Sequence, residues 1–189
     1  MWIKALILGI IQGFAEFLPI SSSGHLVLAS EILQINAPGN VMEVMLHLGT
    51  LGSVFVCFWD KIKMLIIDFF SLFIRKRSRV RSEAANYKNL SLYLILASIP
   101  AVVTGLFLDS YFQELFDKVI YTGVALLFTA GVLWFADYYS KGRKKLNKIK
   151  AKDAFIIGLW QSIAVFPGIS RAGMTIFGGL KRGLKKNLL

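Results

Sequence analysis

Hydrophobic residues fill long stretches of this chain, and polar residues interrupt them at only a few places. Three apolar runs approach the roughly 20 residues that a helix needs to cross a bilayer: residues 41–59, 91–108 and 119–136. Residues 3–18 and 24–35 are shorter apolar stretches, separated by a proline and three serines. The pattern predicts an all-α integral membrane protein, a multi-span helical bundle with a single membrane domain over residues 1–189.

The interruption near the N-terminus occurs a second time near the C-terminus. ILGIIQGFAEFLPISSSGHLVL, residues 7–28, aligns without a gap with IIGLWQSIAVFPGISRAGMTIF, residues 156–177. The copies share two glycines, a glutamine, a phenylalanine and an Ile-Ser pair, more than chance similarity of two apolar segments would give. A helix, a break and a second helix form the pattern of a re-entrant loop, and matching interruptions point to a binding site between repeats. We therefore expect inverted repeats with two re-entrant helical loops.

The two copies differ in the segments on their C-terminal side. Spanning segments come after the first copy, which gives a first repeat of about residues 1–140. Only KRGLKKNLL comes after the second copy, whose repeat begins at about residue 153. If the two copies are equivalent, the second lacks its companion segments, so we expect a truncated or partial protein.

Composition and charge agree with a membrane protein. Hydrophobic residues make up 56% of the 189 residues, above the roughly 45–50% of soluble domains. The net charge of +11 gathers in three basic runs, at residues 75–81, 141–152 and 181–186. So basic a chain raises nucleic-acid binding as an alternative, but no compact polar domain presents these basic residues. The positive-inside rule explains the basic runs better, as loops on the cytoplasmic side of the membrane. It places the loop at residues 109–118, which carries Asp109 and Glu114, outside.

Polar side chains gather at the first interruption, where composition favours lipid. Ionisable groups at membrane depth are costly, so they pair with one another or face an aqueous cavity. Gln12 and Glu16 are four residues apart on one helical face, and Ser22 and His25 share a face if a helix begins at the serines. A single serine there is more simply a helix cap. Taken together with Ser21, the set favours a functional site.

The second interruption adds a permanent positive charge. Ser170, Arg171 and Thr175 lie there, and Arg171 occupies the place of Ser22. A guanidinium suits bidentate phosphate recognition, and the N–H groups of a helix N-terminus bind phosphate too. Arg171 lies within the break rather than at the end of a span, which argues against mere snorkelling to the interface. Together the copies offer a nucleophile, a base, a carboxylate and an anion clamp, which fits chemistry on an anionic group attached to a lipid.

Two motifs carry a family resemblance. QGFAEFLPISSSGH and PGISRAGMTI closely resemble the two signatures of the bacitracin-resistance family of undecaprenyl-diphosphate phosphatases, and the likeness extends over residues 1–180. The resemblance implies hydrolysis of undecaprenyl diphosphate to undecaprenyl phosphate and phosphate. That reaction recycles the carrier lipid for cell-wall synthesis and confers bacitracin resistance. The implied location is the bacterial inner membrane, with the site facing outward.

The resemblance also implies roles for individual residues. Three match catalytic positions: Ser22, His25 and Glu16. Four match positions that bind the diphosphate: Arg171, Ser170, Thr175 and Ser21. A divalent cation, Mg²⁺ or Ca²⁺, is expected with Glu16 and Gln12 as its ligands. Ser22 as nucleophile with His25 as base is the preferred mechanism, and attack by His25 or directly by water stays open. Ala172 stands where the family usually has serine.

Other functions stay open on the sequence alone. A lipid-carrier transporter or flippase would need the anion clamp but no nucleophile, and an inactive partial protein would bind lipid without catalysis. A phosphatidic-acid phosphatase type would need a histidine after Arg171, and both histidines precede it. Glu43 and His47, four apart near the start of a span, line a cavity or serve packing. We expect a polyprenyl diphosphate and the bilayer as partners, no nucleic acid, and leave a homo-oligomer open.

Overall fold

Helices make up almost all of the described structure. The computed structural model describes residues 2–35, 41–71, 90–116, 119–138, 141–145 and 148–186. Within these ranges the chain forms eight α-helices and a single isolated β-bridge. The helices are α1 Trp2–Ala15, α2 Ser22–Ile32, α3 Val41–Cys57, α4 Trp59–Ser71, α5 Leu90–Phe116, α6 Val119–Tyr138, α7 Ala151–Ile163 and α8 Arg171–Lys181. The predicted all-α membrane protein is confirmed.

Two of the described helices are long and apolar enough to cross a membrane. They are Leu90–Leu108, the first part of α5, and α6, in agreement with the predicted spans. The third predicted span is not one straight helix, because α3 ends at Cys57 and α4 continues at a bend of 83°. Large apolar side chains on the two long helices face outward, with Leu106 78% and Trp134 79% exposed. Lipid is the solvent that such a surface requires.

The predicted outside loop at residues 109–118 is wrong in its secondary structure. Helix α5 continues without interruption through residues 109–116, and residues 117–118 lie outside the described ranges. The sequence DSYFQELF contains no glycine or proline to end a helix, so the helix runs on beyond its apolar part. The basic run at residues 75–81 also lies outside the described residues.

The two sequence copies fold into two similar helix pairs. In the register of the alignment, Trp2 at the start of α1 pairs with Ala151 at the start of α7. In the same register Ser22 at the start of α2 pairs with Arg171 at the start of α8. Each pair therefore consists of a helix, a short break and a second helix, as predicted.

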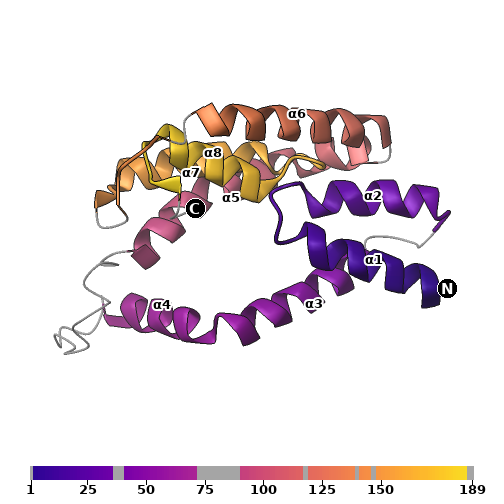
Figure 1. Cartoon of the computed structure of the whole chain (residues 1–189), viewed down its shortest axis with the longest axis horizontal. Coiled ribbons are helices and arrows are strands. Elements are labelled where there is room, and N and C mark those ends of the chain that lie inside the picture. The colour runs from indigo at the N-terminus through magenta and orange to yellow at the C-terminus, as the bar shows by residue number, and fades with distance from the viewer. Residues whose placement is uncertain are drawn as a thin grey trace.

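Each helix pair is a hairpin whose two outer ends meet. The Lys4 ammonium at the start of α1 donates to the carbonyl of Leu33, just after α2, at 2.7 Å. At the other pair, Arg182 just after α8 forms an ion pair with Asp153 of α7 at 2.8 Å. Figure 1 shows the α1–α2 hairpin (indigo) and the α7–α8 hairpin (orange to yellow) turned toward each other at their breaks.

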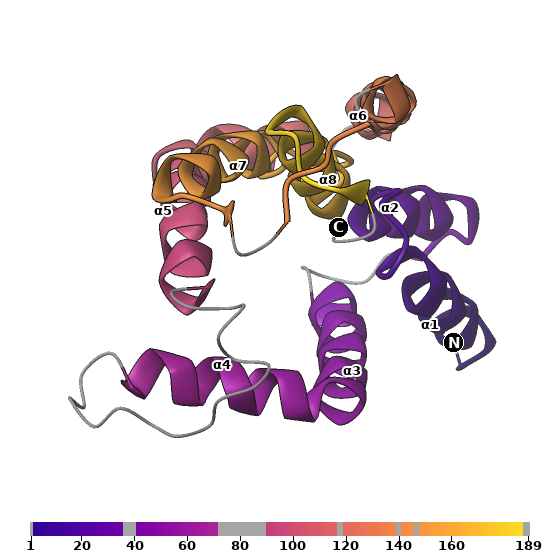
Figure 2. The same ribbon diagram turned by 60° about the vertical axis from the view of Figure 1, so that its left-hand side comes forward.

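Helix α6 joins the two hairpins. It packs against α2 of the first and α8 of the second, while α5 packs most extensively against α7. Figures 1 and 2 show α6 alongside both hairpins, with the bent α3–α4 pair on the opposite side. A small core forms where α6, α7 and α8 meet, built on Ala136, Phe177 and Leu180 with Trp160 packed against it.

A buried carboxylate ties together the outer end of the second hairpin. Asp153 is 1% exposed and accepts hydrogen bonds from Lys144 at 2.5 Å and from Arg182 at 2.9 Å. Burial alone would raise the pKa of its carboxyl. Hydrogen bonds, chiefly from the Lys144 ammonium, outweigh burial and lower that pKa to about 2. The backbone of Lys144 also bridges to Leu184, so two distant basic segments are held at this end.

Replacing Asp153 with Asn should destabilise the protein by about 2 kcal/mol, because one pKa unit of folded-state depression corresponds to about 1.4 kcal/mol. A depressed carboxyl pKa stabilises the folded state above the unfolded pKa of about 4, and this contribution disappears as pH falls toward 2. We expect the thermal midpoint of unfolding in detergent, measured between pH 3 and 7, to be higher for the wild type than for Asp153→Asn at neutral pH. The difference between the two midpoints should shrink as the pH is lowered.

Asp137→Asn is the matched control. Its ion pair with Lys186 joins side chains that are 71% and 63% exposed, and such surface pairs contribute little. A similar loss of midpoint in both variants would contradict the special role of Asp153.

Candidate active site

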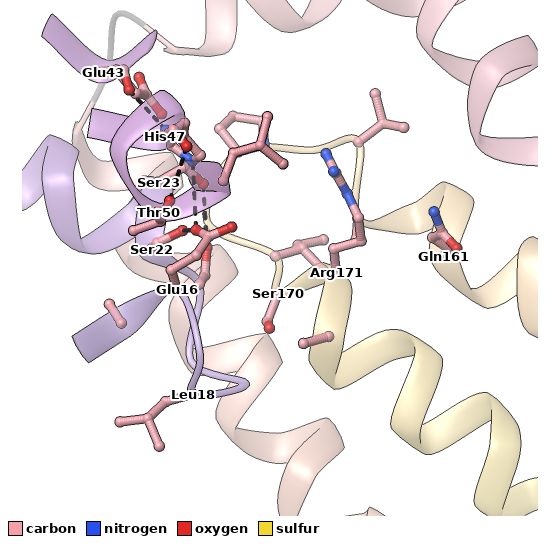
Figure 3. Close-up of a pocket in the computed structure, with 18 of the residues that line it drawn as sticks. Glu16, Leu18, Ser22, Ser23, Glu43, His47, Thr50, Gln161, Ser170 and Arg171 are labelled. Atoms are coloured by element: carbon pink, nitrogen blue, oxygen red, sulfur yellow. Dashed lines mark hydrogen bonds and ion pairs between the residues drawn. The ribbon is translucent and has the colours of Figure 1, made fainter. Parts of the chain in front are cut away.

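A cavity of about 860 Å³ lies where the two breaks meet α3. Polar residues from both hairpins and from α3 line it, and Figure 3 shows ten of the lining side chains with labels. The polar lining residues are Glu16, Ser21, Ser22, Ser23, Glu43, His47, Thr50, Gln161, Ser170, Arg171 and Thr175. The structure therefore brings together the predicted residues of both copies, with the exceptions of Gln12 and His25.

One carboxylate oxygen organises the side of the cavity that the first hairpin and α3 form. The Ser22 hydroxyl donates to Glu16 Oε2 at 2.5 Å, and the Gln12 amide donates to the same oxygen at 3.1 Å. His47 Nε2 lies 3.6 Å from that oxygen (Figure 3). Ser22 is thus hydrogen-bonded to a carboxylate oxygen, and the buried Gln12 helps to hold that oxygen in place.

The turn at Ser21 is the one place in the first break where the backbone is strained. Pro19 follows α1 closely and cannot continue a helix, so the chain must turn before α2 begins. Ser21 makes this turn with φ at 70°, a left-handed conformation that few non-glycine residues adopt. Its buried hydroxyl caps α2 by accepting from the Gly24 N–H at 3.4 Å. The turn aims the start of α2, and with it Ser22, at the cavity.

The second break uses the same cap and places a cation beyond it. Ser170 accepts from the Gly173 N–H at 3.0 Å, as Ser21 does from Gly24. Arg171 follows as the first residue of α8 and lines the cavity. Its guanidinium has no ion pair with any residue that the structure describes, and Figure 3 shows it across from the Glu16 cluster. Thr175 lines the cavity as well, with its hydroxyl bonded to the Ala172 carbonyl.

Matching glycines let the two breaks approach each other. A Cβ on Gly24 would lie 3.0 Å from the Cα of Gly168 and 2.9 Å from the Leu126 side chain. A Cβ on Gly173 would lie 3.3 Å from the carbonyl oxygen of Pro19. The backbone of each break therefore contacts the other hairpin, and this contact places Ser22 and Arg171 at one cavity.

Two predicted residues lie away from the cavity lining. His25 is one turn into α2, and its Nδ1 lies 2.8 Å from the carbonyl oxygen of Ser21. Its role as a base stays a prediction. Gln12 is 1% exposed behind Glu16, where its amide nitrogen also donates to Thr50 at 3.3 Å.

Five polar residues that line the cavity are not among the predicted site residues: Ser23, Glu43, His47, Thr50 and Gln161. For Glu43 and His47 the sequence left a cavity lining open beside a packing role. Thr50 lies three residues after His47 on α3, so the two share a helical face. Gln161 occupies the place of Gln12 in the second copy, so the repeat itself pointed to it.

Oxygen ligands for a divalent cation are few but suitable. Gln12 Oε1 is buried without a hydrogen-bond partner among the described residues, and Glu16 lies one helical turn away. Among the described residues no three His, Cys, Asp or Glu side chains gather as a metal site. Mg²⁺ is commonly held by one or two protein oxygens together with substrate phosphates, and this donor set fits that mode of binding.

A comparison with models of protein families identifies the family of this chain. Residues 5–188 match the family described as bacitracin resistance protein BacA. The chain belongs to this family.

Relatives in several organisms carry the name undecaprenyl-diphosphatase, and three of them show the extent of the similarity. The Bacillus thuringiensis (strain Al Hakam) protein, undecaprenyl-diphosphatase 4, is 43% identical over 98% of this chain. The Alkaliphilus metalliredigens protein is 38% identical over 98%, and the Methanosphaera stadtmanae protein is 38% identical over 97%. The chain spans 65% of the length of the first relative and 68% of the other two.

Gly24→Ala should lower stability, because the added Cβ has no room between Leu126 and Gly168 and overpacking typically costs about 1–3 kcal/mol. The thermal midpoint in detergent measures this. Gly13→Ala is the control, since a Cβ there meets nothing within 4 Å and alanine favours a helix. Equal midpoints for the two variants would show that the breaks do not pack as described.

Proposed function

We propose that this chain hydrolyses undecaprenyl diphosphate to undecaprenyl phosphate and phosphate. Membership of the BacA family and relatives named undecaprenyl-diphosphatase support the substrate class. The observation that carries the proposal is the Ser22 hydroxyl, 2.5 Å from Glu16, at a cavity that Arg171 lines from the other hairpin. A nucleophile beside a proton acceptor, opposite an anion-binding cation, is the arrangement that phosphoryl transfer requires.

In this proposal the second hairpin and the N-terminal ends of α2 and α8 bind the diphosphate. The Arg171 guanidinium has no carboxylate to neutralise it among the described residues, so it is available for phosphate oxygens. Helices α2 and α8 both begin at the cavity, at Ser22 and Arg171. The first N–H groups of a helix have no partners within it, and they favour anions. Ser21, Ser170 and Thr175 shape these two ends.

Catalysis then begins with proton transfer from Ser22 to Glu16. The Ser22 oxygen attacks the terminal phosphorus, and the bond from that phosphorus to the bridging oxygen breaks. Undecaprenyl phosphate leaves with the proton that Glu16 returns to its bridging oxygen, and Ser22 carries the phosphoryl group. In the second step water gives a proton to Glu16 and its oxygen attacks the phosphorus. The bond from phosphorus to the Ser22 oxygen breaks, phosphate leaves, and Glu16 returns the proton to Ser22. Arg171 stabilises the charge that develops on the phosphoryl oxygens.

The histidines have different places in this scheme. His47 Nε2 lies 3.6 Å from the Glu16 carboxylate, close enough to exchange a proton with Glu16 during the reaction. His25 does not line the cavity. The geometry therefore favours Glu16 over His25 as the first proton acceptor. His25 as nucleophile and direct attack by water are alternatives that a Ser22→Ala variant separates from the serine mechanism. His25 as base is an alternative that a His25→Ala variant tests.

A divalent cation, Mg²⁺ or Ca²⁺, belongs to the proposal. Glu16 and Gln12 would hold it, and when bound it would neutralise charge on the diphosphate oxygens. Because these two side chains are a small ligand set, the ion would rely on oxygens of the substrate for further ligands.

The arrangement of the two hairpins supports a proposed orientation in the membrane. The ends of the α7–α8 hairpin lie among basic residues, which favours the inside. The α1–α2 hairpin faces it break to break, so its ends lie at the opposite side (Figure 1). Two re-entrant hairpins that enter from opposite faces are an inverted repeat. The proposal places the chain in the bacterial inner membrane, with the cavity open to the outside.

Ser22→Ala and Arg171→Ala should each reduce phosphate release from undecaprenyl diphosphate by at least about 100-fold, because each removes a group acting directly on the phosphoryl group. Release is measured with the purified chain in detergent. Ser53→Ala is the control, since within the described part of the chain its hydroxyl bonds only to its own helix, at the Thr50 carbonyl. Ser22→Ala with near wild-type release would rule out the serine mechanism, and binding without release by the wild type would favour a transporter.

Chelation should stop phosphate release, and added Mg²⁺ or Ca²⁺ should restore it. Gln12→Ala removes one of the two proposed ligands, so we expect it to need about tenfold more cation for half-maximal release. Titration of activity with the cation measures this. Full activity in excess chelator, or an unchanged titration in Gln12→Ala, would contradict the assigned ligands.

A further inference from the structure

Thr129 of α6 holds the second break from outside the hairpin. Its hydroxyl donates to the carbonyl oxygen of Gly168 at 3.2 Å and accepts from the N–H of Ser170 at 3.1 Å. The Thr129 side chain is 2% exposed, so water cannot replace these bonds without rearrangement. One side chain thus pairs with backbone groups on both sides of Ile169, where the break turns into α8.

The two backbone groups depend on this hydroxyl. A buried backbone N–H or carbonyl left without a hydrogen-bond partner costs about 1–3 kcal/mol. The break is therefore most stable in the position where Thr129 bonds to both the Gly168 carbonyl and the Ser170 N–H. A hydroxyl serves here because it donates one hydrogen bond and also accepts. Gly168 reaches this position with φ at +86°, and Ser170 immediately precedes Arg171. The position of Thr129 therefore determines where Arg171 enters the cavity.

The same face of α6 also contacts the first hairpin. The Leu126 side chain lies against Gly24 of α2, and the Ala125 side chain lies against Gly168, which also meets the backbone of Thr122. The side chains of Ala125, Leu126 and Thr129 lie within about one helical turn. These three side chains therefore set the position of both breaks, and with them the distance between Arg171 and Ser22.

We infer that Thr129 is a positioning residue for the proposed reaction, acting through the backbone of the second break on Arg171. The inference rests on the proposed function. It assigns Thr129 no contact with the substrate, since the cavity lining does not include it.

The same helix supplies a matched control. Thr122 lies two turns before Thr129 and is 0% exposed, and its hydroxyl has no partner among the described residues. Valine keeps the branched shape of threonine and removes only the hydroxyl. Thr129→Val thus breaks two hydrogen bonds to the break, Thr122→Val breaks none, and Thr129→Ser keeps the hydroxyl.

The activity experiment measures kcat and KM for undecaprenyl diphosphate well below each variant's thermal midpoint. We expect Thr129→Val to lower kcat at least about tenfold, because a displaced catalytic group loses rate steeply. Thr129→Ser should restore most of it, and Thr122→Val should match the wild type. Wild-type kcat in folded Thr129→Val, or an equal loss in Thr122→Val, would overturn the positioning role.

Hydrogen exchange tests the same inference without catalysis. Amide exchange of the peptide that covers residues 166–171 should be faster in Thr129→Val than in Thr122→Val, because the Ser170 N–H loses its acceptor. Equal exchange in the two variants would overturn the inference. A wild-type chain that releases no phosphate would instead overturn the proposed function, while the exchange comparison would still decide the role of Thr129.

Discussion

The backbone contact between the two breaks, Gly24 against Gly168 and Gly173 against Pro19, decides where the polar residues of the cavity lie. Neither hairpin contains the proposed site alone. The first supplies Ser22 and Glu16, and the second supplies Arg171. Only a chain without a side chain at Gly24 lets the second break come this close. The glycines, rather than the charged residues, make a shared cavity possible.

Breaking two helices leaves backbone groups that need partners, and the structure satisfies them locally. Ser21 and Ser170 cap the helices that begin at the cavity, and Thr129 binds the backbone of the second break from α6. Non-helical backbone at membrane depth is tolerated only where protein or water satisfies it. These partners also hold the break rigid, and a rigid break is what keeps an arginine aligned with a nucleophile on another helix.

The sequence predicted the parts of this arrangement that leave a local pattern. Apolar length revealed α5 and α6, and the repeat revealed both helix pairs. The starts of α2 at Ser22 and of α8 at Arg171 come from the structure, which makes Arg171 the first residue of a helix rather than part of the break. Contacts between distant segments left weaker signals. His47 lies beside Glu16 only because α3 packs on the first break. Nothing in the local sequence distinguishes Thr129 from the other residues of the span α6. The helical extension of α5 differs from the loop that the charged residues Asp109 and Glu114 predict, because no glycine or proline within residues 109–116 ends the helix.

The most direct test of the account is to find where the phosphoryl group resides during turnover. Undecaprenyl diphosphate labelled in its terminal phosphate is mixed with the chain, the reaction is quenched within one turnover, and the labelled peptide is identified by mass spectrometry. The account predicts the label on Ser22, and its loss in Glu16→Gln, where the proton acceptor is gone. A label on His25 or on any other residue, or turnover that never labels the protein, would contradict it.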